Sequence, residues 1–277
     1  MSKTTPEGFT RTPETESDPE FLSTLEKGLR VLRSFNQDRP EMQLSEVAAV
    51  TNLNPAVARR CLKTLVKLGY VAQHGRRFLL RPEVLSFGSA YLASMNIEAV
   101  ATSSLQRVRD ETGDSSSLAV LSRADVLYLV HVPTNRHIRL SVTPGTKFPA
   151  HATSLGRVLL AFQTDVEINA WLDTADLVRY TERTITSKDE LRRRIMQVRE
   201  DGYASAQDEL DYGIVSVAVP IFNEERRAIA AINCSTSTTR IAQDELVRTR
   251  VPLLQSTARE LEAALRKWPV LLHSLRH

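Results

Sequence analysis

The chain contains little cysteine and no long apolar run. Only Cys61 and Cys234 occur among its 277 residues, too few for a disulfide framework, and this usage is typical of a reducing compartment. No apolar stretch reaches the roughly 20 residues that a transmembrane helix requires. Residues 1–20 lack the apolar core of a signal peptide. The sequence therefore predicts a cytoplasmic protein with no membrane partner, whose residues 1–20 form a disordered polar tail.

Motifs with well-understood catalytic mechanics are also absent. There is no GxSxG elbow, no HExxH helix, no GxxxxGKS/T loop and no GxGxxG turn. His131, His137 and His151 are separated by irregular stretches and no cysteine accompanies them, so no zinc site is expected. Asp208 and Glu209 are adjacent, so their side chains are expected on opposite sides of the chain, which does not suit paired-carboxylate catalysis. The sequence predicts no catalytic residue, no metal and no cofactor.

Acidic residues are absent from one segment of the chain. Residues 54–81 include seven Lys or Arg residues and not one Asp or Glu, although the whole chain carries a net charge of only +3. The overall composition is ordinary for a globular protein long enough for two domains. Such a local concentration of positive charge is the electrostatic signature of a surface that binds nucleic acid. The alternative interpretation is a solvated helix face.

A helix that begins at Pro55 is predicted to carry much of this charge. Asn54 can cap the helix by accepting a backbone hydrogen bond, proline suits the first helical position, and Gly69 ends the helix. Apolar residues recur at spacings of three and four and form the expected inward stripe: Ala58, Cys61, Leu62, Leu65 and Leu68. Basic and polar residues fall largely outside the stripe: Arg59, Arg60, Lys63, Thr64 and Lys67.

Two helices and a hairpin surround this helix. The expected elements are helices over 21–35 and 45–51, the second capped by Ser45, and strands over 70–73 and 76–81 joined at His74-Gly75. The order helix, helix, helix, hairpin predicts a winged helix-turn-helix, whose third helix enters the major groove of DNA. Cap, stripe, basic face and basic hairpin agree, which favours DNA binding over a solvated face. The predicted DNA contacts are Ser45, Asn54, Ala56, Arg59, Arg60, Lys63, Thr64, Arg76 and Arg77.

The rest of the chain predicts a linker and an α+β domain. A helix over 82–94 has more apolar surface than a free linker would expose, and we expect it to pair with a partner. The expected helices beyond it cover 96–112, the segment after Thr153, 165–173, 188–201 and 243–267. The expected strands cover 118–121, 126–132, 138–142, 214–221 and 228–235. An antiparallel sheet flanked by helices is the simplest architecture for this order.

Two features of this domain indicate a binding site. Residues 149–156 lead from a loop into a helix, and the amides at a helix N-terminus can hold an anion such as a carboxylate. On strand 228–235 the residues expected to share one face are Ile229, Ala231, Asn233 and Ser235, and on its partner strand Ser216 and Ala218. Small and polar groups on these faces are typical of a ligand cavity, although a core with paired hydroxyls explains the same spacing.

Several segments carry a family resemblance. FLSTLEKGLRVLRSF (21–35), PAHATSLGRVLLA (149–161) and GYASAQDELDYGIVSVAVPIFN (202–223) together resemble the IclR family of bacterial transcriptional regulators. LKTLVKLGYV, RRFLLRPEVLSFGSAYL and FPAHATSLGRVLLA are most similar to the PcaR, PcaU and PobR group, which regulates aromatic-acid catabolism. The implied fold is a winged helix-turn-helix over 21–81, a linker or dimerisation helix over 82–95 and a GAF-like effector domain over 96–277, assembled as dimers or dimers of dimers.

The resemblance also implies the effector-binding residues. They are the helix start at Ser154 and Leu155, the strand residues Ser216, Asn233 and Ser235, and the pocket wall His137, Leu140 and Phe148. Position 206 is Ala where some relatives that bind small keto acids place Asp, and the wall includes two ring side chains. These departures favour a larger, flatter anion such as 4-hydroxybenzoate or protocatechuate over glyoxylate or pyruvate.

The expected function is therefore control of genes for aromatic-compound catabolism. A homodimer, or a tetramer built from two dimers, would read a palindromic operator in double-stranded DNA, and a small aromatic carboxylate would change its DNA affinity or its contact with RNA polymerase. Two alternatives stay open. The effector could be a small aliphatic keto or hydroxy acid, or the chain could be a hydrolase acting on an aromatic acid derivative.

Overall fold

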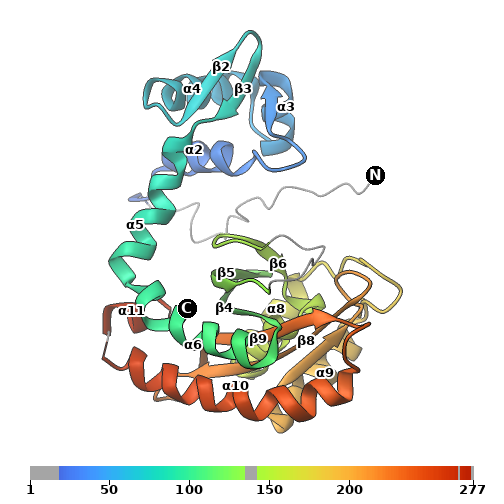
Figure 1. Cartoon of the computed structure of the whole chain (residues 1–277). Helices are drawn as coiled ribbons and strands as arrows, with labels where there is room; N and C mark the ends of the chain where they lie inside the picture. The colour runs from blue at the N-terminus through green and yellow to red at the C-terminus, as the bar shows by residue number, and fades with distance from the viewer. Residues whose placement is uncertain (1–18, 135–141, 268, 276–277) are drawn as a thin grey trace. The chain divides into compact units, whose positions relative to one another are not determined.

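The chain folds into two compact units. The structure, a computed structural model, describes residues 19–134, 142–267 and 269–275, and the chain divides between Ala90 and Tyr91 into an N-terminal and a C-terminal unit (Figure 1). The predicted tail over 1–20 and the predicted strand over 138–142 lie almost entirely outside the described residues. Over the part of the chain that is described, no helix combines the length and the apolar composition needed to cross a bilayer.

The N-terminal unit is a winged helix-turn-helix. Its helices are α2 (Ser23–Arg33), α3 (Leu44–Thr51) and α4 (Pro55–Lys67), and its strands are β1 (Glu41–Gln43), β2 (Val71–His74) and β3 (Arg77–Leu80). Within the described residues β3 pairs with both β1 and β2 in an antiparallel sheet. The predicted order of three helices and a hairpin is confirmed, whereas the three-residue strand β1 was not predicted.

Helix α4 begins where the sequence predicted. The Asn54 side chain accepts a hydrogen bond from the backbone N–H of Ala56 at 2.9 Å, and Pro55 occupies the first turn. Most of the predicted inward stripe is buried, but Leu68 is 61% exposed. The prediction for Leu68 was wrong: the helix ends at Lys67, and Leu68 is the C-cap residue at its exposed end.

Two further details of this unit differ from the prediction. Ser45 does not cap α3: the helix begins one residue earlier, with Gln43 at the N-cap, where its backbone N–H donates to Glu46 Oε2 at 2.6 Å. The hairpin turn is Gly75-Arg76 rather than His74-Gly75. Gly75 has φ +60°, a left-handed conformation that glycine adopts without strain. A two-residue hairpin turn can take glycine at its first position, so Gly75 opens the turn and does not close it.

The C-terminal unit begins within a helix. The turn η1 (Pro82–Val84) leads into α5 (Leu85–Met95), and α6 (Ile97–Thr112) follows. Asn96 separates the two helices with φ 52°, a left-handed conformation that breaks the helical path. Both helices match the predicted segments.

A β-sheet with helices on both faces forms the body of this unit. Its strands are β4 (Ser115–Ser122), β5 (Asp125–Val132), β6 (Lys147–Pro149), β7 (Ala204–Gln207), β8 (Ile214–Phe222) and β9 (Ala228–Ser237). Its further helices are η2 (Ala150–Ala152), α7 (Ser154–Ala161), α8 (Asp165–Thr174), α9 (Lys188–Asp201), α10 (Gln243–Leu265) and α11 (Pro269–Ser274). Among the described residues the strands form one antiparallel sheet in the order β6-β5-β4-β9-β8-β7. The predicted α+β class is confirmed, although β6, β7 and α11 were not predicted.

Each face of the sheet packs against its own set of helices. Helices α6 and α10 cover one face (Figure 1). Val215, Val217 and Val219 of β8 are buried against this face. Helices α7, α8 and α9 cover the other face, which receives Ala218. The alternation along β8 is the period-two pattern of a strand buried on both sides.

Two bulges interrupt the alternation of side chains on β5 and β9. The β4–β5 register shifts between Leu118 and Ala119, which leaves Leu129 as an extra residue on β5. The β8–β9 register shifts in the same way and leaves Ile229 as an extra residue on β9. Ile229 therefore packs on the α6–α10 face and does not share a face with Asn233, contrary to the prediction.

Candidate DNA interface and effector pocket

The basic residues of the N-terminal unit lie on its surface. The predicted outer face of α4 is exposed at Arg59, Arg60, Lys63, Thr64 and Lys67. Ser45, Asn54 and Ala56, at the starts of α3 and α4, are exposed as well, and Arg76 is exposed at the turn of the hairpin. The helix and the wing thus both present side chains that can reach a DNA backbone or a base edge.

Arg77 differs from the other basic residues of the hairpin. Its Nε lies 3.5 Å from Glu41 Oε1 and its Nη1 lies 4.0 Å from Glu46 Oε2, and its side chain is 42% exposed. The two acidic residues neutralise part of its charge locally. Arg77 is therefore less available to a phosphate than its neighbour Arg76.

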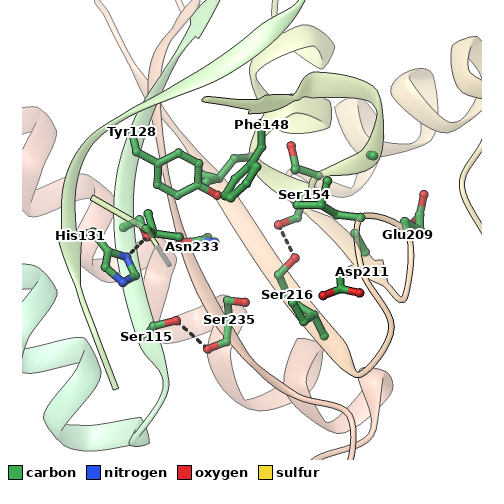
Figure 2. Close-up of a pocket in the computed structure, with 18 of the residues that line it drawn as sticks. Ser115, Tyr128, His131, Phe148, Ser154, Glu209, Asp211, Ser216, Asn233 and Ser235 are labelled. Atoms are coloured by element: carbon green, nitrogen blue, oxygen red, sulfur yellow. Dashed lines mark hydrogen bonds between the residues drawn. The ribbon is translucent and has the colours of Figure 1, made fainter. Parts of the chain in front are cut away.

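The C-terminal unit contains a pocket of about 220 Å³. It lies between the start of α7, the sheet face that α7 covers, and the loop from Glu209 to Asp211 (Figure 2). Pockets for drug-sized ligands are typically about 300–1,000 Å³. The smaller volume here suits a ligand of a single ring or less.

One end of the pocket is the start of α7. Thr153 caps the helix, since its Oγ1 accepts from the N–H of Gly156 at 3.1 Å. The first amides of a helix, here at Ser154 and Leu155, have no acceptor within the helix. Ser154 Oγ also lies 2.9 Å from Ser216 Oγ on β8. Amides and hydroxyls converge here in an arrangement that can hold an anion.

A buried ion pair between Arg157 and Glu209 holds this end of the pocket in place. Arg157 of α7 is 0% exposed and Glu209 of the β7–β8 loop is 9% exposed. Arg157 donates through both terminal nitrogens to the two carboxylate oxygens of Glu209, and its Nε donates to the carbonyl of His151 at 3.2 Å. The Thr184 hydroxyl in turn donates to the Glu209 carbonyl at 2.6 Å. The pair ties the pocket loop to the helix start.

Two aromatic rings form one wall of the pocket. Tyr128 of β5 and Phe148 of β6 meet edge to face, with ring centroids 5.5 Å apart and planes at 86°. Burial raises the pKa of the Tyr128 hydroxyl, which is therefore neutral. Figure 2 shows the two rings with His131 and Asn233 to one side and the Ser154–Ser216 pair to the other.

The far side of the pocket is polar. Ser117 on β4 pairs in register with His131 on β5, and Ser117 Oγ lies 3.0 Å from His131 Nδ1. Burial lowers the pKa of His131, so the imidazole is neutral at pH 7. On the other side of Ser117, Asn233 of β9 is the cross-strand neighbour. These three residues form a row across three adjacent strands.

Most of the predicted effector residues meet at this pocket. Those that line it are Phe148, Ser154, Leu155, Ser216, Asn233 and Ser235. His137 and Leu140 lie outside the described residues. Sequence reasoning missed Tyr128, His131, Ser115 and Ser117, which also line the pocket. The bulge at Leu129 puts Tyr128 and His131 on one face although they are three residues apart, and strict alternation excludes that placement.

The pocket offers no metal site and no free cation in its described part. No group of three His, Cys, Asp or Glu side chains in the described residues could hold a metal ion. No Lys or Arg is among the described lining residues, and the nearby Arg157 is paired with Glu209. A bound anion would therefore depend on backbone amides and hydroxyls.

A winged helix-turn-helix joined to an α+β unit with a small pocket defines the class of two-unit transcriptional regulators. The chain belongs to the IclR family of bacterial transcriptional regulators. Residues 24–75 match the model of the IclR helix-turn-helix domain, and residues 89–263 match that of the bacterial transcriptional regulator IclR C-terminal region. The members of this family are regulators and not enzymes.

Three similar proteins illustrate the relationship. The Pca regulon regulatory protein of Pseudomonas putida is 36% identical, over 88% of this chain and 84% of its own. The structure of an IclR transcriptional regulator from Alicyclobacillus acidocaldarius is 28% identical, with a TM-score of 0.74 over 88% of this chain and 99% of its own. The inducer-binding domain of the Acinetobacter PobR transcription factor, a double mutant in complex with 3-hydroxybenzoic acid, is 32% identical, with a TM-score of 0.55 over 59% of this chain and 96% of its own.

Proposed function

We propose that this regulator senses a small aromatic carboxylate, such as 4-hydroxybenzoate or protocatechuate, and controls genes for the catabolism of aromatic compounds. The observation that carries the proposal is the pocket itself. It combines the helix start at Ser154 with the ring wall of Tyr128 and Phe148 in a space of about 220 Å³. An aromatic acid needs both an anion site and a flat apolar surface.

The relatives support the same class of effector. The PobR domain that is 32% identical to this chain was crystallised with 3-hydroxybenzoic acid, and the P. putida relative regulates the Pca regulon. Ala206 adds to this support. It lines the pocket and is small and uncharged, so it leaves room for the anion and does not repel it.

The experiment is a calorimetric titration of the purified protein with 4-hydroxybenzoate, protocatechuate, benzoate and pyruvate in one buffer. We expect saturable binding of a hydroxybenzoate and no binding of pyruvate. At a ligand concentration of about one hundred times Kd the folded state gains roughly 2.7 kcal/mol, so the melting temperature must rise as well. Binding of pyruvate alone would favour an aliphatic acid effector. The absence of binding by every compound would refute the proposal.

The winged helix-turn-helix supports a proposed assembly on DNA. Residues 21–81 bind DNA, residues 82–95 link and dimerise, and residues 96–277 bind the effector. A dimer, or a dimer of dimers, places its recognition helices on the half-sites of a palindromic operator. The effector then acts by binding one quaternary state more tightly than the other, which changes DNA affinity or contact with RNA polymerase.

The exposed basic residues are proposed to divide into two roles. If Arg59 contacts a base edge, Arg59→Ala should weaken binding to the selected operator by about 1–3 kcal/mol and relax specificity at one base pair. If Arg76 contacts a phosphate, Arg76→Ala should weaken all sequences alike and reduce the salt slope by about one. Fluorescence anisotropy with selected and scrambled duplexes over a range of KCl concentrations measures both effects.

Arg77→Ala is the matched control on the same hairpin. Because Glu41 and Glu46 already accompany Arg77, its removal should change the salt slope less than Arg76→Ala does. An equal loss on selected and scrambled DNA for Arg59→Ala would contradict its assignment to a base contact.

A further inference from the structure

The side chain of Asn233 is buried at the pocket, and its oxygen receives no hydrogen bond from the described residues. Asn233 lines the pocket and is only 4% exposed. No described residue donates to Asn233 Oδ1, although this atom is fully buried. A buried polar atom without a partner is unfavourable, and native structures rarely keep one without a reason.

The serine hydroxyls of β4, the strand beside Asn233, are engaged elsewhere. Ser117 Oγ pairs with His131 Nδ1 at 3.0 Å, and Ser116 Oγ donates to the backbone carbonyl of Asn233 at 2.9 Å. Ser115 Oγ donates to the backbone carbonyl of Ser235 at 2.9 Å. None of these three hydroxyls makes a hydrogen bond to the Asn233 side chain. The side chain of Asn233 itself lines the pocket, so a group bound there can pair with its amide.

The position of Asn233 relative to the anion end limits what that partner can be. Asn233 pairs in register with Ala218 on β8, two residues along that strand from Ser216, which contacts Ser154. Neighbouring strands lie about 4.8 Å apart and residues i and i+2 about 6.6 Å apart. The amide and the anion end are thus separated by about the length of one substituted ring.

The surface between these two polar ends is aromatic. Tyr128 and Phe148 form the wall there, and Figure 2 shows their rings over the interval between Asn233 and the Ser154–Ser216 pair. The order along the pocket is an anion site, an aromatic wall and an amide whose oxygen has no partner among the described residues. A ring that carries a carboxylate at one end and a hydroxyl toward the other has the same order of groups.

We propose that Asn233 recognises a hydroxyl group on the effector ring and makes the pocket selective for hydroxylated over unsubstituted aromatic acids. A hydroxyl both donates and accepts, so it can pair with the amide in either orientation of the Asn side chain. A hydrogen, fluorine or methyl group at the same place leaves the buried amide unpaired. The inference rests on the proposed aromatic-acid function and adds to it the group that is read and the residue that reads it.

The test compares ligands that differ in this group alone. Calorimetric titration of the full chain with 3- and 4-hydroxybenzoate, the corresponding fluoro- and methylbenzoates, and benzoate gives the ratio of dissociation constants for each pair. We expect one of the hydroxybenzoates to bind at least about tenfold more tightly than its methyl and fluoro counterparts, because a site built to pair with a hydroxyl penalises an analogue that lacks it.

A variant assigns this preference to Asn233. Asn233→Leu keeps the approximate size of the side chain and removes the amide, so the ratio of the dissociation constant of the methyl ligand to that of the hydroxy ligand should fall to near one. Cys234→Ala is the matched control, since Cys234 is the next residue of β9 and is buried on the opposite face of the sheet. It should leave the ratio unchanged.

The outcomes separate the two proposals. Equal binding of hydroxy, fluoro and methyl compounds by the wild-type chain would overturn the role of Asn233 and leave the aromatic-acid function standing. A preference that survives in Asn233→Leu would overturn it too. Failure of every aromatic acid to bind would refute the proposed function itself. The wild-type ligand series decides the question even if the leucine variant does not fold.

Discussion

Replacing Glu209 by leucine is expected to lower the free energy of unfolding of the C-terminal unit by about 3–5 kcal/mol. The substitution leaves the guanidinium of Arg157 at 0% exposure without its carboxylate partner. An uncompensated buried charge is among the most destabilising defects of a folded protein, because neither water nor a counter-charge replaces the lost interaction. For a unit of this size the melting temperature should fall by roughly 6–20 °C.

Ligand binding should fail in the same variant. Glu209, Leu210 and Asp211 line the pocket, and the ion pair holds their loop against α7. A titration with 4-hydroxybenzoate at a temperature where the variant is still folded separates loss of the pocket from loss of the fold.

The double variant Arg157→Met, Glu209→Leu is the control for the charge. Replacing both partners by apolar residues removes the buried charge, and such replacements are often neutral or stabilising. The double variant should therefore be more stable than Glu209→Leu alone, as measured by thermal or urea unfolding. If the single and double variants unfold alike, the ion pair is not what stabilises this end of the pocket.

Local signals in the sequence predicted the DNA-binding unit well. The cap at Asn54, the proline after it and the glycine beyond α4 act within one or two turns of the chain, so they can be read without tertiary contacts. The errors in this unit also have local causes. Gln43 replaces Ser45 as a cap because Glu46 completes a capping interaction with it, and Leu68 follows the last helical residue.

The pocket was predictable only where strand alternation is regular. Ser216, Asn233 and Ser235 were placed correctly on one face because β8 and β9 are regular between residues 214 and 221 on one strand and 230 and 237 on the other. The bulges at Leu129 and Ile229 invert the alternation on their strands. A bulge arises from the pairing of two strands distant in sequence, so no pattern within one strand predicts it.

The buried ion pair between Arg157 and Glu209 could not be predicted from local sequence patterns either. Arg157 and Glu209 are 52 residues apart, and a charged side chain on a helix is by default expected at the surface. Only the folded arrangement reveals that this arginine is the positioning residue for the pocket loop.

Replacing Gly156 by alanine is expected to destabilise the C-terminal unit by several kcal/mol, beyond the roughly 1–3 kcal/mol of ordinary overpacking. A Cβ at this position would lie closer than 3.0 Å to the carbonyl oxygen, the Cα and the carbonyl carbon of Ala150. These are backbone atoms, so the clash cannot be relieved by a change of rotamer. The helix start would have to move away from η2.

That movement would displace the anion end of the pocket. Gly156 donates its N–H to Thr153 Oγ1, and the neighbouring Ser154 hydroxyl contacts Ser216 at 2.9 Å. Both contacts depend on the close approach of α7 to the backbone at Ala150. Gly156→Ala should therefore weaken binding of any carboxylate ligand, hydroxylated or not, in the calorimetric titration.

Gly88→Ala is the matched control. Gly88 lies in helix α5, and a Cβ added there would meet no described atom within 4 Å, so alanine should stabilise the helix by about 0.5–1 kcal/mol. Its effector affinity should equal that of the wild type. If Gly156→Ala melts at the wild-type temperature and binds the ligand normally, α7 does not require its close contact with Ala150, and the helix-start amides cannot be the rigid anion site that the pocket needs.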